Sequence, residues 1–207
     1  ISLPINVFGY NSTHGDNPTI ASGNQPVIST GTNTWTNGTY WKFSYITVTG
    51  ITTASTYMII GGLADFWNSC KIIHTSTGRG ILTSNGHYMQ NCELDGRGGC
   101  NLLFAVGSAG GALINCYLHD ATTWIMFGTG GYFLVSSCII DTAINGLLIN
   151  GTQYTCLNNT IVNCSVGISI TASAAASHIV NNIISYCGTG ISSAGVYDMS
   201  KFYNNNL

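Results

Sequence analysis

A short pattern recurs along most of the chain, in steps of 22, 24, 22, 21, 23 and 23 residues. Each copy has a small polar residue, then Cys or Asn, one variable residue, and then Ile or Leu. We term the Cys or Asn the anchor. The anchors are Cys70, Cys92, Cys116, Cys138, Asn159, Asn182 and Asn205. A regular period of this length indicates structural units that stack along one axis, each contacting its neighbours.

Each copy holds short apolar runs separated by Gly, Asn, Ser or Thr, which is typical of strands joined by turns. One set of apolar residues stands three positions before the anchors: Trp67, Met89, Leu113, Val135, Cys156, Ile179 and Phe202. A second apolar set stands nine to eleven residues after the anchors: Ile81, Leu103, Ile125, Leu147, Ile168 and Ile191. No window carries an apolar stripe with the helical period over three turns. The repeat therefore predicts an all-β solenoid whose equivalent side chains lie directly above one another.

The segments Asn181-Asn182-Ile183-Ile184 and Gly167-Ile168-Ser169-Ile170 are clear examples of the pattern. It resembles the right-handed parallel β-helix family, the pectate-lyase-like fold that phage tailspikes also use. The resemblance implies a single-stranded right-handed parallel β-helix with about 22–23 residues per coil. We expect residues 1–40 to form the N-terminal entry and first coils, and residues 41–207 to form one continuous helix. The domain is expected to be part of a longer chain or an assembly.

The eight cysteines are expected to be mostly reduced and buried, because they repeat at inward positions. Cys70, Cys92, Cys116 and Cys138 share the anchor position, whereas Cys164 and Cys187 share a position five residues after an anchor. A free thiol fills such narrow columns as a small hydrophobic group. Neighbouring coils are close enough for a bridge, so one or two disulfides are an alternative. No Cys-x-x-Cys pair exists and the histidines are scattered, so we expect no metal site and no cofactor.

The composition excludes several classes of partner. Charged residues make up 6% of the chain, and five Lys and Arg against seven Asp and Glu leave a net charge of −2. A nucleic-acid-binding surface needs a basic stripe, which this chain lacks. No apolar run is long enough to cross a bilayer, so we expect no membrane insertion. The weak surface charge favours packing against other subunits, as a homo-oligomer or a larger assembly.

The outward positions beside the anchors carry the main group of charges. Strand alternation places five of them on one exposed sheet face: Glu93, Asp95, Tyr117, His119 and Asp141. Asp95 and Asp141 are two coils apart, roughly 9–10 Å along the axis, which approaches the carboxylate separation of inverting glycosidases. His119 between them could hold or relay a proton. Asp95, His119 and Asp141 are therefore the candidate catalytic residues, and polar strand ends that serve solubility are the alternative.

Candidate glycan-binding residues are Glu93, Arg97, Tyr117, Trp124 and Tyr132. Arg97 could bind a substrate carboxylate through two hydrogen bonds. Trp124, Tyr132 and Tyr154 are expected around turns, where exposed rings could stack on sugars, although aromatic residues also fill solenoid corners. The adjacent Asp-Asp, Gly-His-Gly and Arg-Ile-Lys patterns of polygalacturonase-like members are missing, since Tyr88 follows Gly86-His87.

Three functions are candidates, and the first of them is implied by the resemblance to the tailspike-containing family. The first is a structural and recognition domain of a virion appendage or secreted surface protein, extracellular or on the virion surface, that contacts a polysaccharide or cell-surface glycan. The second is a polysaccharide lyase or glycoside hydrolase that uses the Asp95, His119 and Asp141 group. The third is a structural filament subunit without a ligand. Glycan cleavage, glycan binding and concentration-dependent assembly distinguish the three.

Overall fold

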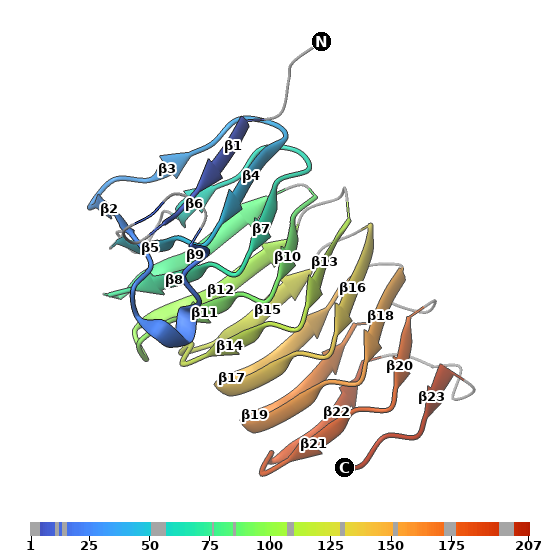
Figure 1. Cartoon of the computed structure of the whole chain (residues 1–207). Helices are drawn as coiled ribbons and strands as arrows, with labels where there is room; N and C mark the ends of the chain where they lie inside the picture. Colours follow the sequence, from blue (N-terminus) through green and yellow to red (C-terminus); the bar gives the residue numbers. More distant parts are fainter. Residues whose placement is uncertain are drawn as a thin grey trace.

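A computed structural model describes residues 5–10, 13, 16–50, 57–75, 77–84, 86–106, 110–128, 131–150, 153–171, 177–194 and 201–207. The chain winds into an elongated stack of coils, from the N-terminal strands at one end to the C-terminal strands at the other (Figure 1). All strand pairings among the described residues are parallel, and the steps between paired residues match the period of the repeat. The predicted parallel β-solenoid is confirmed.

One side of the stack is a nine-stranded sheet, which we term face A. Its strands, in spatial order, are β1 (Ile5–Phe8), β4 (Trp41–Ser44), β7 (Phe66–Asn68), β10 (Tyr88–Gln90), β13 (Gly111–Ile114), β16 (Tyr132–Ser136), β18 (Gln153–Leu157), β20 (His178–Val180) and β23 (Phe202–Tyr203).

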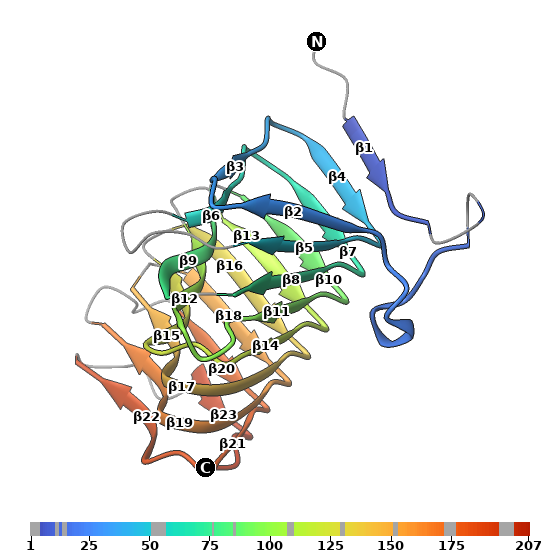
Figure 2. The ribbon, with the colours of Figure 1, turned by 90° about the vertical axis from the view of Figure 1, so that its left-hand side faces the viewer.

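The remaining strands form a folded sheet with two faces, seen from another side in Figure 2. Face B contains β2 (Val27–Gly31), β5 (Thr47–Gly50), β8 (Lys71–His74), β11 (Glu93–Asp95), β14 (Tyr117–His119) and β21 (Ile183–Ser185). Face C contains β3 (Trp35–Thr36), β6 (Tyr57–Ile60), β9 (Gly78–Ser84), β12 (Cys100–Val106), β15 (Trp124–Gly128) and β22 (Thr189–Ser193). The long strands β17 (Ile139–Ile149) and β19 (Thr160–Ile170) run through the corner and belong to both faces.

The N-terminal segment joins the same sheets. Strand β1 pairs with β4, and β2 pairs with β5, so residues before position 41 already contribute strands to faces A and B. A short 3-10 helix, η1 (Ile20–Ser22), lies between β1 and β2 in the sequence. Among the described residues, no helix has the length and apolar character that crossing a membrane requires.

The small polar residue before each anchor makes the corner between faces A and B. It adopts a left-handed backbone conformation in every repeat: Ser69, Asn91, Asn115, Ser137, Asn158, Asn181 and Asn204 have φ between 52° and 56°. This conformation costs most L-residues about 1–2 kcal/mol, and the short polar side chain of Asn tolerates it best. The polar residue of the repeat therefore marks a sharp reversal of the chain.

The anchors point inward just after this corner and form a hydrogen-bonded ladder. Asn182 Nδ2 donates to Cys156 O at 3.0 Å, and Asn159 Nδ2 donates to Val135 O at 3.0 Å. The thiol of Cys138 donates to Leu113 O at 3.5 Å. In each case the acceptor lies three residues before the anchor of the preceding coil. Thiols and amides thus serve the same carbonyl position, which explains how both occupy one column.

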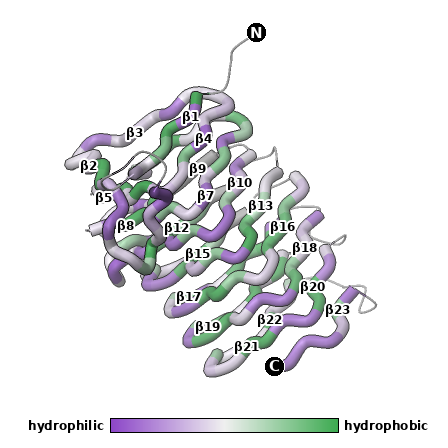
Figure 3. The backbone as a smooth tube through the Cα atoms, viewed as in Figure 1, coloured by the Kyte–Doolittle hydropathy of each residue, from purple (hydrophilic) through white to green (hydrophobic). Residues whose placement is uncertain are grey.

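The core runs the length of the stack between the three faces, and hydrophobic and hydrophilic residues alternate along the strands (Figure 3). The residues three positions before the anchors form one buried column, with Phe202 at its end partly buried. The second apolar set forms two columns, because Leu147 pairs with Met126 rather than with Ile125. Just before these columns, Gly146 and Gly167 leave no room for a side chain. A Cβ on Gly146 would lie 2.6 Å from Gly167 O, and a Cβ on Gly167 would lie 2.7 Å from Gly190 O, both in the next coil.

All eight cysteines are free thiols, seven of them buried and Cys187 half-buried. The expected inward position of the cysteines is therefore confirmed. Burial raises the pKa of the Cys156 thiol to about 12. Burial likewise raises the pKa of the Cys92 thiol well above its ordinary value. These thiols are protonated at neutral pH and pack as small apolar groups.

Candidate functional site

The outward positions of face B bring the candidate catalytic residues into one row. Asp95 on β11 pairs with His119 on β14, and His119 pairs with Asp141 on β17. A second row, two positions earlier on each strand, contains Lys71, Glu93 and Tyr117. The predicted shared face is confirmed, because the repeat spacing keeps the strands in register.

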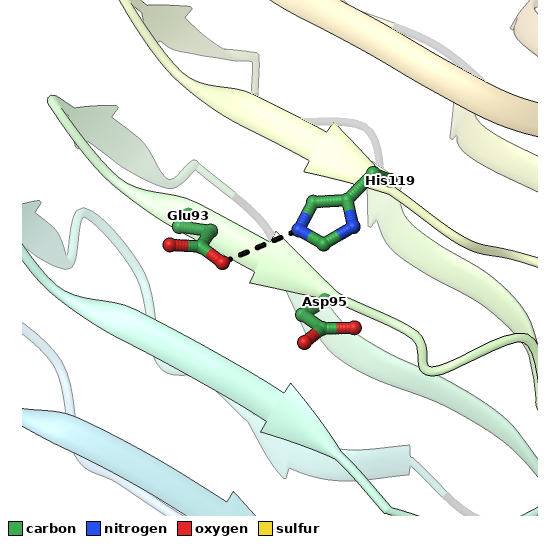
Figure 4. A group of neighbouring side chains, drawn as sticks. All are labelled: Glu93, Asp95 and His119. Carbon is green, nitrogen blue, oxygen red and sulfur yellow. Dashed lines mark hydrogen bonds and ion pairs between the residues drawn. The ribbon is translucent and has the colours of Figure 1, made fainter. Parts of the chain in front are cut away.

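A chain of charged contacts crosses this face from coil to coil. Lys71 Nζ lies 2.6 Å from Glu93 Oε1, and His119 Nε2 lies 3.3 Å from the same oxygen. The other imidazole nitrogen, Nδ1, lies 2.8 Å from Asp120 Oδ2. Figure 4 shows the ring of His119 directed from β14 toward the carboxylates on β11. His119 therefore bridges two carboxylates on opposite sides of its ring.

These contacts change the pKa values of the two central groups. The hydrogen bond from His119, followed by the hydrogen bond and the charge of Lys71, lowers the pKa of Glu93 although burial opposes the change. Burial disfavours the charged imidazolium of His119, but hydrogen bonds to Glu93 and Asp120 outweigh it and raise the pKa of His119. The pair favours an ionised carboxylate beside a protonated imidazole.

The expectation that the whole group is exposed is wrong for Asp95, which is 7% exposed. Arg97 folds back over it: Arg97 Nε lies 3.1 Å from Asp95 Oδ2, and the Arg97 backbone N–H donates to Asp95 Oδ1 at 2.9 Å. His119 is half-buried on the other side. The guanidinium that could bind a substrate carboxylate is thus already paired through Nε, while the side chain of Arg97 remains largely exposed.

Asp141 has a different set of partners from Asp95. Asn163 Nδ2 and Thr142 Oγ1 donate to Asp141 Oδ1 at 2.8 and 2.9 Å, and the Tyr117 hydroxyl donates to Oδ2 at 3.4 Å. The ring of Tyr117 stacks on that of His119, with 4.1 Å between centroids. Burial and the charge of Asp141 raise the pKa of Tyr117. Tyr117 thus connects Asp141 to His119.

The structure separates the remaining candidate glycan-binding residues. Trp124 begins β15 on face C, where it lines a hollow with Tyr57, Arg79, Asn101 and Leu102. Tyr132 begins β16 on face A and is 73% exposed. The expected turn position of Tyr154 is wrong, because it lies in β18 and its side chain is completely buried. Alternation turns Tyr154 inward when its neighbours Gln153 and Thr155 face outward.

A groove of about 660 Å³ lies on face A beside Tyr132. Tyr88, which is 49% exposed, belongs to the same groove. Gly110 and Gly111 line the groove between the strands that carry the two tyrosines. A Cβ on Gly110 would lie 2.4 Å from Tyr132 O, so this position has no room for a side chain. Its remaining lining includes Leu134, Gln153, Thr155, His178 and Lys201. Sequence analysis missed this groove, although the Gly110-Gly111 pair between two outward tyrosines could have indicated it.

Face B also holds a group of residues that could ligate a metal ion, which sequence spacing did not indicate. One ligand atom each from Glu93, Asp95 and His119 lies within 4.8 Å of the others. The spacing did not reveal this group, because His119 reaches the two carboxylates from the neighbouring coil. Carboxylate oxygen and imidazole nitrogen together suit a divalent transition metal.

Residues 28–207 match the family model of the right-handed β-helix region. The chain belongs to the right-handed β-helix family. No curated protein and no solved structure gives a significant match. Membership of the β-helix family supports a structural or carbohydrate-related role. The finer resemblance to pectate-lyase-like or tailspike-like members stays a prediction.

Proposed function

We propose that this chain is a structural and recognition domain of a virion appendage or a secreted surface protein, and that it binds a glycan through the groove on face A. The observation that carries the proposal is the pair of exposed tyrosines, Tyr88 and Tyr132, on either side of the glycine-lined opening. Aromatic rings offer flat apolar surface with a polar edge, which suits stacking on sugar rings. The surrounding amide, hydroxyl and imidazole groups supply hydrogen-bond partners for sugar hydroxyls.

The shape of the groove also favours an extended ligand. Tyr88, Ala112, Leu134, Thr155 and His178 occupy one register column on five successive strands of face A, and all of them except Ala112 are at least partly exposed. A ligand that lies along this column meets a new side chain about every 4.8 Å, the spacing between neighbouring strands. A linear polysaccharide extends in this way, whereas a compact small molecule would contact only part of the row.

Glycan-array binding of wild type and Tyr132→Ala tests this proposal. We expect wild type to bind a subset of polysaccharides, and Tyr132→Ala to lose at least tenfold in affinity through the lost stacking surface. Tyr186→Ala is the matched control, because Tyr186 is also highly exposed but lies away from the groove. Absence of wild-type binding to the array, or equal loss in both variants, would refute the groove as a glycan site.

Assembly is part of the same proposal. Face B exposes apolar side chains, with Ile139 and Ile183 about half exposed, beside a surface with little charge to keep copies apart. We propose that these positions contact further copies of the chain in a homo-oligomer. Light scattering across a concentration series measures the assembly. Replacement of both isoleucines by Lys should leave a folded monomer, and an unchanged oligomer would contradict this part of the proposal.

A second candidate function is polysaccharide cleavage on face B. The observation in its favour is that His119 lies between Asp95 and Asp141 in one row, with a raised pKa suited to proton transfer. The double variant Asp95→Asn with Asp141→Asn should then abolish cleavage of a polysaccharide that wild type degrades. Lack of wild-type cleavage across acidic and neutral polysaccharides removes this candidate.

A further inference from the structure

We propose that Glu93, Asp95 and His119 form a binding site for a divalent transition-metal ion such as Zn²⁺. The site lies on face B, whereas the glycan groove lies on face A, so the proposal does not rest on glycan binding. One ligand atom from each of the three residues already lies within 4.8 Å of the others. Rotation of the carboxylates is the main adjustment needed to bring all three to about 2.0–2.2 Å from a central ion.

The donor set favours a transition metal over calcium or magnesium. Those two hard cations prefer oxygen ligands, whereas His119 contributes an imidazole nitrogen. Zn²⁺ accepts both imidazole and carboxylate ligands and often uses three protein side chains, leaving one position for water or a ligand. Glu93 and Asp95 supply two negative charges that compensate the charge of the ion. The open position would point outward from face B, where an oxygen of a bound molecule could reach it.

Asp120 supplies an independent argument, because it is outside the ligand set. Its Oδ2 lies 2.8 Å from His119 Nδ1, on the side of the ring away from Glu93. A carboxylate in this position holds the proton on Nδ1 and directs Nε2 toward the metal, as outer partners of metal-bound histidines usually do. Figure 4 shows Glu93 on the side of the imidazole that this arrangement leaves for the ion, with Asp95 next to it on the same strand.

Lys71 and Arg97 determine how readily an ion enters. Lys71 Nζ contacts Glu93 Oε1 at 2.6 Å, and Arg97 Nε contacts Asp95 Oδ2 at 3.1 Å. Glu93 has a second carboxylate oxygen, whereas both oxygens of Asp95 accept hydrogen bonds from Arg97, one from its backbone N–H and one from Nε. Both cationic side chains are partly exposed, so the side chains of Lys71 and Arg97 can move outward and release one oxygen of each carboxylate when the ion arrives. Removing the charge of Lys71 should therefore strengthen metal binding, whereas a purely structural ion-pair network would gain nothing from this change.

Isothermal titration calorimetry with ZnCl₂ on the full chain tests the site. We expect one ion per chain in wild type, at least tenfold weaker binding in Glu93→Gln and His119→Ala, and weaker binding in Asp120→Asn. Lys71→Gln should bind more tightly than wild type. Asp16→Asn is the matched control, because Asp16 is an exposed carboxylate outside the three-residue group, and it should bind as wild type does. Circular dichroism establishes that each variant is folded.

Titration with Co²⁺ identifies the ligands, because the eight thiols are alternative metal ligands. Visible ligand-field bands without a sulfur-to-cobalt charge-transfer band support the proposed oxygen and nitrogen site. A charge-transfer band in wild type, no zinc binding up to 1 mM, or unchanged binding in folded Glu93→Gln and His119→Ala would each overturn the proposal. If a variant does not fold, the Lys71→Gln comparison decides: unchanged affinity also overturns it.

Discussion

The ladder of inward anchors predicts that Asn182 is one of the most sensitive polar positions in the protein. Its side chain is completely buried and serves two coils at once. Asn182 Oδ1 accepts the Asn159 backbone N–H at 3.0 Å and Asn159 Nδ2 at 2.9 Å. Its own Nδ2 donates to Cys156 O at 3.0 Å and to Asn205 Oδ1 at 2.9 Å. The substitution Asn182→Ala removes all of these contacts.

The expected decrease in the free energy of unfolding of Asn182→Ala follows from the polar groups that lose their hydrogen-bond partners. The Asn159 backbone N–H loses its acceptor inside the stack, and Asn159 Nδ2 keeps only its bond to Val135 O. Each buried donor without a partner costs about 1–3 kcal/mol, so the two together cost about 2–6 kcal/mol. This is a large part of the roughly 5–15 kcal/mol that stabilises a typical domain. Asn182→Cys should cost less, because a thiol can still donate to Cys156 O as Cys138 does to Leu113 O.

Urea unfolding of wild type, Asn182→Ala and Asn182→Cys measures these differences. With a slope of about 2 kcal/mol/M, a loss of 4 kcal/mol lowers the midpoint by about 2 M. Thr189→Ala is the control, because Thr189 is exposed and its replacement should change stability by less than about 0.5 kcal/mol. A urea midpoint for Asn182→Ala within 0.5 M of wild type would show that the ladder contributes little to stability. A lower midpoint for Asn182→Cys than for Asn182→Ala would refute the equivalence of thiol and amide.

Three further predictions concern protonation, thiol reactivity and packing. The pKa of His119 is raised above its ordinary value of about 6.5. Protonated His119 therefore stabilises the folded protein fully below that pH, and this contribution is lost as the pH rises through the folded-state pKa. His119→Gln should lower the melting temperature more at pH 6 than at pH 8.5, and an equal decrease at both pH values would contradict this. Cys187 is half-buried and should react first with a thiol reagent, so Cys187→Ser should remove the fast phase. In Gly167→Ala the new Cβ would lie 2.6 Å from Ile184 Cγ2 and 2.7 Å from Gly190 O, and overpacking should cost about 1–3 kcal/mol in thermal unfolding.

Much of the fold follows from the repeat, because a solenoid turns sequence period into spatial contact. The spacing placed Cys92, Cys116 and Cys138 in one inward column, and the structure confirms their burial. It also placed Asp95, His119 and Asp141 in one row, because parallel pairing preserves the register from coil to coil. The short polar residue before each anchor was part of the pattern, and the left-handed corner gives its physical cause.

The candidate site was harder to predict, because alternation tells inward from outward but does not tell which of three faces a residue occupies. Trp124 and Tyr132 both face away from the core, yet β15 and β16 belong to different faces. The direction of a long side chain is also missing from the pattern. Arg97 turns back to cover Asp95, and His119 reaches across to Glu93 on the neighbouring strand. These contacts depend on side-chain rotamers, which repeat spacing does not specify.

The anchor ladder has a consequence for how such a protein lengthens. Each anchor from Cys116 onward donates to a carbonyl of the coil before it, and that coil offers the same carbonyl whether its own anchor is a thiol or an amide. A gene segment that encodes one complete coil would therefore bring a donor for the unit on one side and an acceptor for the unit on the other. Duplication of such a segment could extend the protein while every junction remained chemically equivalent to those already present.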